Sequence, residues 1–253
     1  MTIRVERKGP VFTVVLSRPE RKNAVDRATA HALSRVMDEF EADEAASVAV
    51  LYGEGGTFCA GADLKAVSEG NLNDLDPDGP GPLGPTRRTF SKPLIAAVEG
   101  HAVAGGLELS LLCDLRVAAE SAVFGVFCRR WGVPLIDGGT VRLPRVVGHG
   151  RAMDMILTGR PVGAREALAI GLANRVVPDG TAREAAEALA LEIASFPAIC
   201  MRADRMSAIH QWDLDLDAAL RAEGRGGTPA LHAEAGAGAA RFAGGKGRHG
   251  RFE

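Results

Sequence analysis

Two glycine-containing segments, about forty residues apart, carry the residue types best suited to chemistry. They are residues 58–63, with the sequence FCAGAD, and residues 100–108, with the sequence GHAVAGGLE. Each places backbone N–H groups at an Ala/Gly turn just before a predicted helix. If the two turns face each other, two N–H donors can point at one oxygen and form an oxyanion hole, which stabilises negative charge on a reacting carbonyl oxygen. Glu108 follows the second turn by one helical turn, so we expect it to act as an acid or base beside that hole.

Predicted strands and helices alternate around these turns. A buried apolar strand is predicted at 47–52, directly before the first turn, and another at 94–98, directly before the second. A helix is predicted from about Asp26, because apolar residues recur there at helical spacing. Further strands are predicted at 3–7, 11–16, 115–118 and 174–177. Strand, helix and strand in this order favour a parallel α/β arrangement.

The segment 70–85 and the second half of the chain have a different character. Residues 70–85 are rich in Gly, Pro and Asp, so we predict a flexible surface loop outside the core that covers the site at the first turn. The second half is more helical. Helices are predicted at 151–158 and 164–170, after the capping-box pattern at 181–184, and from Thr228-Pro229 in an Ala-rich stretch.

Composition excludes several classes of protein. The 253 residues are 46% hydrophobic and 25% charged, with a formal net charge of −2, which is typical of a soluble globular protein and does not indicate nucleic-acid binding. The four cysteines are widely spaced without a CxxC pair, so we expect reduced thiols in a cytoplasmic protein. We see no signal peptide and no apolar run near the ~18 residues that a membrane span requires.

Together with the surrounding sequence, the two turns resemble the crotonase, or enoyl-CoA hydratase/isomerase, superfamily. The resemblance covers nearly the whole chain in order, including residues 16–24, 58–64, 97–100, 104–109, 113–115, 124–125, 132–134, 138–140, 142–144 and 157–159. It implies an α/β fold, a crotonase-like spiral of repeated β-β-α units. It also implies an acyl-CoA-binding core at 1–195, and a C-terminal helical region at 196–253 that makes the contacts of a homotrimer or a dimer of trimers.

The resemblance also implies an acyl-CoA thioester as ligand. Carried over by position, the N–H groups of Ala60 and Gly105 are the two oxyanion donors, and the substrate's adenine end lies along Ala60, Gly61, Ala62 and Asp63. No metal or further cofactor is implied, because the backbone polarises the thioester and coenzyme A is part of the substrate. Two readings stay open for Arg21 and Lys22, which are either solvated loop charges or contacts to the phosphates of coenzyme A.

At one position the chain departs from the family pattern. Family hydratases commonly use two glutamates, and the first corresponds to Glu108, whereas the second position holds Cys128. A thiol is a poor substitute for a carboxyl acid or base, so we expect Cys128 to be a small buried residue of the substrate site. Asp137 is the nearest candidate replacement. Trp131 is expected in the core or in the wall of the acyl pocket.

These residues lead to one leading function and two alternatives. The leading hypothesis is an enoyl-CoA hydratase-type lyase that adds water to a 2-enoyl-CoA through an enolate, with Glu108 and Asp137 transferring protons. The missing glutamate leaves isomerisation or another acyl-CoA reaction open. A non-catalytic acyl-CoA-binding protein is the alternative outside the enzymes. Arg129 and Arg130 are further candidates, as partners of Asp137, of Glu108 or of an acidic acyl group.

Overall fold

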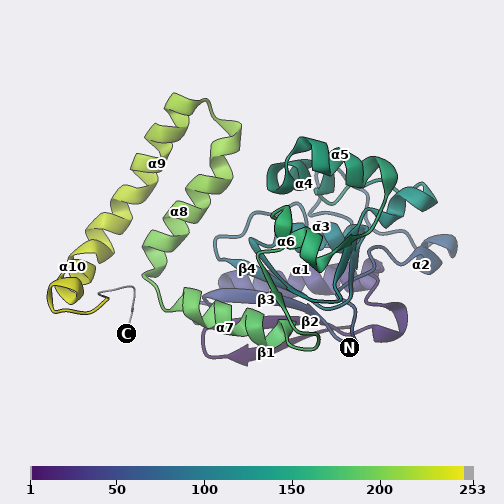
Figure 1. Ribbon diagram of the computed structural model, residues 1–253, viewed down its shortest axis with the longest axis horizontal. Helices are drawn as coiled ribbons and strands as arrows, with labels where there is room; N and C mark the ends of the chain where they lie inside the picture. Colours follow the sequence, from purple (N-terminus) through teal and green to yellow (C-terminus); the bar gives the residue numbers. More distant parts are fainter. Residues whose placement is uncertain (1, 248–253) are drawn as a thin grey trace. The chain divides into compact units, whose positions relative to one another are not determined.

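Two units make up the chain. The first ends at Ile193 and the second begins at Ala194. The structure is a computed structural model that describes residues 2–247 (Figure 1). The last residues of the predicted C-terminal region, 248–253, lie outside the described residues.

A six-stranded sheet runs through the first unit. Its strand order is β1-β2-β3-β4-β6-β9, and within this sheet, as far as the structure describes it, only β1 and β2 pair in antiparallel fashion. The strands are β1 Ile3–Lys8, β2 Val11–Leu16, β3 Val48–Gly53, β4 Leu94–Val98, β6 Leu115–Ala119 and β9 Arg175–Val177. They agree closely with the predicted strands. Four of them, β2, β3, β4 and β6, are short and mainly buried apolar runs.

A second, three-stranded sheet gives the fold its repeating unit. It contains β5 His101–Val103, β7 Val123–Gly125 and β8 Val162–Gly163 in that order. The chain passes from β4 to β5 and then into α3, Gly105–Leu112, and it next passes from β6 to β7. Cys59, after β3, also bridges to Ala102 of β5. The pairs β4-β5 and β6-β7 therefore each add one strand to each sheet.

Helices cover both faces of the large sheet near its antiparallel edge. Phe12 of β2 packs on Phe40 of α1, Arg27–Ala42, with ring centroids 5.4 Å apart. The next residue, Thr13, points to the other face and donates a hydrogen bond of 3.0 Å to Glu187 of α7, Ala182–Ala194. This alternation follows from the two-residue repeat of a strand, and it explains why every residue of β2 is buried.

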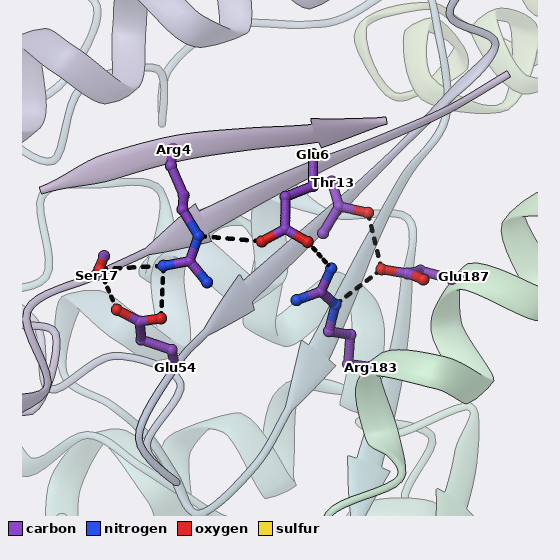
Figure 2. A network of polar contacts seen from close by, with 7 residues as sticks. All are labelled: Arg4, Glu6, Thr13, Ser17, Glu54, Arg183 and Glu187. Atoms are coloured by element: carbon purple, nitrogen blue, oxygen red, sulfur yellow. Dashed lines mark hydrogen bonds and ion pairs between the residues drawn. The ribbon is translucent and has the colours of Figure 1, made fainter. Parts of the chain in front are cut away.

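A polar network fastens the N-terminal hairpin to α7 on that second face (Figure 2). The Arg183 side chain donates to Glu187 at 2.8 Å and to Glu6, and Arg4 donates to Glu6 at 3.0 Å. Arg4 also reaches Glu54 at the end of β3, at 2.5 Å. The network thus joins three segments that are far apart in the sequence.

The remaining helices of the first unit are α2 Leu64–Ser68, α4 Gly139–Val147, α5 His149–Thr158 and α6 Ala164–Ala169. Helix α3 is buried along its whole length, as expected for a helix that is apolar on all sides. Among the described residues, no helix combines the length and apolar character needed to cross a bilayer.

The prediction that residues 70–85 contribute nothing to the core is wrong for their C-terminal part. Residues 81–86 are buried. Gly84, at φ +97°, comes so close to α1 that an added Cβ would lie 2.5 Å from the carbonyl oxygen of Ala30. Gly84, one of the glycines that suggested an exposed loop, is instead required for this close approach.

The second unit contains α8 Ala198–His210, α9 Leu216–Ala230 and α10 Gly236–Ala243. The prediction that Thr228-Pro229 opens a helix is wrong, because both residues lie in the last turn of α9. Pro229 has no N–H to donate within that helix, and a π-helical turn, Leu231–Ala235, follows directly. The position of a proline near a helix end does not by itself distinguish a start from an end.

Candidate active site

The two predicted turns face each other in the structure. A Cβ added to Gly61 would lie 2.8 Å from the backbone nitrogen of Gly105, and one added to Gly105 would lie 3.4 Å from the Cα of Gly61. The strands leading into the turns also pair, because the N–H of Val103 donates to the carbonyl of Cys59 at 3.1 Å. Gly61 has a φ of +92°, so both its conformation and the lack of space exclude a side chain.

The N–H of Ala60, which the resemblance implies as an oxyanion donor, has an acceptor within the protein. The N–H of Ala60 donates to the carbonyl of Lys22 at 3.1 Å, so it is already used within the protein. The carbonyl of Gly61 and the N–H of Asp63 both bond to Val25. Because backbone groups alternate in direction along an extended segment, the N–H of Ala62 points away from Val25. It donates to no acceptor within residues 2–247.

Gly105 supplies the second candidate donor. It is the first residue of α3, where a backbone N–H has no partner within its own helix, and it finds no other acceptor in the described part of the chain. Ala104, just before it, adopts φ 54° and ψ −127°, which is costly for a residue with a Cβ. A hydrogen bond of 2.8 Å from Ala104 N–H to the carbonyl of Gly125 holds this turn in place.

Glu108 lies one turn further along α3, and its side chain is fixed in a buried position. Its Oε1 accepts hydrogen bonds from the N–H groups of Asp137, at 2.9 Å, and Gly139, at 2.8 Å. Burial, and next the nearby charge of Asp137, raise the pKa of Glu108 to about 7. A carboxyl group with this pKa exchanges protons readily at neutral pH, as a general acid or base requires.

Asp137 borders the same cavity, but one of its oxygens is held by the segment that follows α2. Its Oδ1 accepts the N–H of Leu83 at 2.9 Å and the hydroxyl of Thr86. Burial raises the pKa of Asp137, and the bonds to Thr86 and Leu83 oppose that shift. Asp137 therefore anchors the buried segment 81–86 and at the same time presents a carboxyl group to the cavity.

Arg142 is a residue of this site that sequence reasoning missed as a functional candidate. It is in the first turn of α4, and its guanidinium donates to the carbonyl of Asp137 at 3.1 Å. Its positive charge lowers the pKa of both Glu108 and Asp137, against the larger effect of burial. The hypothesised pairing of Arg129 and Arg130 with Asp137 or Glu108 is wrong, because these side chains donate to the carbonyls of Ile156 and Gly159 instead. Their pairing with an acidic acyl group stays a prediction.

A cavity of about 440 Å³ joins these groups. Its wall is mainly apolar and includes Ala62, Gly105, Glu108, Cys128 and Asp137. Large apolar side chains that are also partly open to solvent surround it; these are Leu64, Leu72, Leu75, Trp131 and Ile136. The size and lining fit a small-molecule site.

Cys128 and Trp131 both line the cavity, in different settings. Cys128 is buried, and burial, followed by the negative charge of Glu108, raises the pKa of its thiol. The neutral thiol is thereby favoured, as in a small apolar wall residue. Trp131 is 69% exposed, so it belongs to the rim of the cavity and not to the core.

Three of the other predicted binding residues lie away from the cavity wall. Asp63 caps α2 by accepting the N–H groups of Lys65 and Ala66, and it forms an ion pair of 3.0 Å with Arg18. Arg21 and Lys22 are exposed on the loop that precedes α1. Whether they contact coenzyme A stays a prediction. Among residues 2–247, no group of three or more His, Cys, Asp or Glu side chains could hold a metal ion.

Comparison with known proteins identifies the family. A sequence model described as enoyl-CoA hydratase/isomerase matches residues 6–242. The enoyl-CoA hydratase EchA19 of Mycobacterium tuberculosis is 41% identical over 185 residues, which cover 70% of this chain and 69% of that protein. A carnitinyl-CoA dehydratase of Proteus mirabilis is 38% identical over 190 residues, covering 74% of this chain and 72% of that protein.

The fold comparison agrees. The crystal structure of the enoyl-CoA hydratase EchA1 from Mycobacterium marinum matches with a TM-score of 0.90 and 37% identity, and the match covers 96% of this chain and 95% of that one. The predicted crotonase-like α/β fold is therefore confirmed. With this fold, this sequence match and two glycine turns facing each other beside a buried glutamate, the chain belongs to the enoyl-CoA hydratase/isomerase family.

Proposed function

We propose that this protein adds water across the double bond of a 2-enoyl-CoA thioester. The observation that carries the proposal is that two N–H groups without a protein acceptor, those of Ala62 and Gly105, border the same cavity as Glu108. A thioester oxygen that accepts both N–H groups is polarised, and the partial positive charge at the start of α3 favours the same oxygen. The names of the relatives, hydratase and dehydratase, support this reaction.

The reaction balances with the groups at this site. Glu108, as a carboxylate, takes a proton from a water molecule whose oxygen bonds to C3 of the enoyl group. The electron pair of the C2–C3 double bond moves to give an enolate, with its negative charge on the thioester oxygen. A proton then bonds to C2 and the carbonyl re-forms, so the product is a 3-hydroxyacyl-CoA.

We assign the delivery of the second proton to Asp137. It borders the cavity, and its raised pKa favours the protonated form that can donate. Cys128, at the position where the family pattern has a glutamate, is a wall residue in this scheme because its thiol pKa is raised as well. Exchange of protons with solvent afterwards restores Glu108 to the carboxylate and Asp137 to the acid.

The scheme uses backbone N–H groups and carboxyl groups alone, so we propose that no metal or cofactor is needed besides the coenzyme A of the substrate. Activity is expected to survive dialysis against EDTA. For the coenzyme A moiety we keep the predicted contacts with Arg21, Lys22 and the first glycine turn as part of the proposal. The reaction suits the cytoplasm, which is the location we propose.

The second unit is proposed to mediate self-association into a trimer or a dimer of trimers. Its helices expose large apolar side chains, including Leu216 at 74%, Leu231 at 67% and Phe242 at 62%. Exposed apolar patches of this kind often mark protein interfaces. Sedimentation equilibrium is expected to give the mass of three or six chains, and a monomer would contradict this part of the proposal.

The test of the reaction is the ultraviolet absorbance of crotonyl-CoA mixed with the purified protein. Hydration removes the conjugated enoyl-thioester band, and mass spectrometry should find a product heavier by one water. Glu108→Gln keeps the shape of the side chain and removes its base, so we expect kcat to fall by roughly 10²–10⁴-fold. An unchanged band with the wild-type protein, or full activity in Glu108→Gln, would overturn the proposal.

A further inference from the structure

Residues 70–79, which we call the strap, connect α2 to the buried segment 81–86. Asn73 is the one strap residue that is buried, at 6% exposure, and its neighbours on both sides are exposed. Its side-chain amide nitrogen donates to the carbonyl of Val25 at 3.2 Å and to that of Pro82 at 2.8 Å. A buried amide with two such bonds holds a loop in one place, because leaving those groups unpaired is costly.

The two carbonyls that Asn73 reaches lie in segments that contact the two glycine turns. Val25 pairs with the first glycine turn, since its N–H donates to the carbonyl of Gly61 at 2.8 Å. Pro82 precedes Leu83, whose N–H bonds to Asp137. The Leu83 side chain also lies directly against the second turn, because a Cβ added to Gly105 would be 2.7 Å from its Cδ2.

The strap also supplies part of the cavity wall. Leu72 and Leu75, on either side of Asn73, line the cavity and are 44% and 56% exposed. Apolar side chains gain stability when another apolar group covers them. Leu72 and Leu75 belong to the same cavity wall as Gly105 and Glu108. A longer acyl chain bound at Gly105 therefore has more apolar surface to place against this wall than a four-carbon chain has.

The other attachments of the strap are weaker. Asp74 pairs with His31 at 2.6 Å and with Arg27 at 3.5 Å, but all three side chains are about half exposed. Exposed ion pairs of this kind stabilise little. Arg87 donates to the carbonyls of Asp76 and Pro77 further along, on the surface.

We propose that Asn73 is a positioning residue that sets the acyl-chain specificity of this site. It holds Leu72 and Leu75 where an apolar, uncharged acyl chain longer than four carbons contacts them. The proposal rests on the proposed function. It concerns discrimination between chain lengths, which a residue needed only for stability would not change.

The experiment compares kcat/KM for crotonyl-CoA and for trans-2-octenoyl-CoA in the wild type and in Asn73→Ala. We expect the ratio of the octenoyl value to the crotonyl value to fall about fivefold or more in Asn73→Ala, mainly through KM for the longer substrate. The matched control is Asn71→Ala, which removes the same side chain from an exposed strap position two residues away. It should keep the wild-type ratio.

Each outcome decides between the claims. An unchanged ratio in Asn73→Ala, whether or not both kcat/KM values fall equally, would overturn the role of Asn73 while leaving the proposed function intact. A wild-type protein that hydrates neither substrate would overturn the proposed function itself. If Asn73→Ala fails to fold, Asn73→Ser keeps one donor and should lower the ratio to a smaller extent; an unchanged ratio there would also contradict the proposal.

Discussion

The polar network of Figure 2 and the cavity of the first unit hold their carboxyl groups in opposite ways. In the network, hydrogen bonds lower the pKa values of two glutamates. Arg183 donates to Glu6, and Ser17 and Arg4 donate to Glu54. In the cavity, burial raises the pKa values of Glu108 and Asp137. The first arrangement favours the charged form and the second favours the neutral form.

The opposite pKa shifts have opposite consequences for the stability of the folded chain. The network carboxyl groups bind protons less readily in the folded chain than in the unfolded one, so the stability they contribute is lost as pH falls through their folded pKa values. Glu108, with a pKa raised to about 7, binds a proton more readily in the folded chain. Its contribution is therefore complete below its unfolded pKa and is lost as pH rises through about 7. The site thus costs stability at the pH where it is proposed to act.

Among the substitutions that compare the network with the cavity, Gly61→Ala is expected to lower kcat the most. The new Cβ would lie 2.8 Å from the nitrogen of Gly105, so the two turns must move apart. Loss of one oxyanion donor corresponds to a fall in kcat of roughly 10²–10³-fold. Stopped-flow measurement of crotonyl-CoA hydration gives kcat.

The matched control for this change is Gly56→Ala. Gly56 also has a positive φ, of +76°, but nothing lies within 4 Å of its added Cβ. We expect it to lose some stability from backbone strain and to keep most of its kcat. Equal losses of kcat in both variants would show that strain alone, and not the position of the donors, accounts for the effect.

Asp137→Asn is expected to cause the next largest fall in kcat. Asparagine keeps an oxygen that can accept from Leu83 and Thr86, so the segment 81–86 should stay in place while the proton donor is lost. We expect kcat to fall about 10²-fold. Thr86→Val removes the hydroxyl bond and leaves the carboxyl group, so its kcat should fall much less. If Asp137→Asn kept wild-type kcat, Asp137 would be an anchor of the segment and not a proton donor.

Arg183→Ala, in the network, is expected to have the smallest effect. Its side chain is partly exposed and bonds to Glu6 and Glu187. The free energy of unfolding in urea should fall by about 1 kcal/mol or less, with kcat/KM unchanged within a factor of about two. Arg175→Ala, which removes an exposed ion pair of 3.8 Å outside this network, should change stability still less. A loss of kcat in Arg183→Ala would show that the network and the site are not separate.

The sequence allowed good prediction of those elements whose pattern is local. The strand at 94–98 and the isolated acid of the apolar helix at Glu108 needed only nearby residues for their interpretation. The strands of the small sheet were missed because each is two or three residues long, too short to show alternation. Their pairing depends on partners far away in the chain.

Other errors at the site arose from contacts that are distant in sequence. Whether the N–H of Ala60 or that of Ala62 is left without a protein acceptor depends on the carbonyls of Lys22 and Val25, which no local spacing reveals. The burial of residues 81–86 depends on close approach to α1. The only sequence signal for Arg142 as a residue of the site is its position five residues after Asp137. The turn between them brings its guanidinium to the carbonyl of Asp137.

The most direct test of the central claim is the pH dependence of kcat/KM for crotonyl-CoA hydration, measured from about pH 5 to pH 9. Glu108 must be a carboxylate to take a proton from water, so kcat/KM should rise with pH, with a midpoint close to the pKa of about 7. At higher pH kcat/KM should fall again, where Asp137 loses the proton that it donates. A profile that is flat through this range, or that has already risen fully at its acid end, would contradict a buried Glu108 acting as the base.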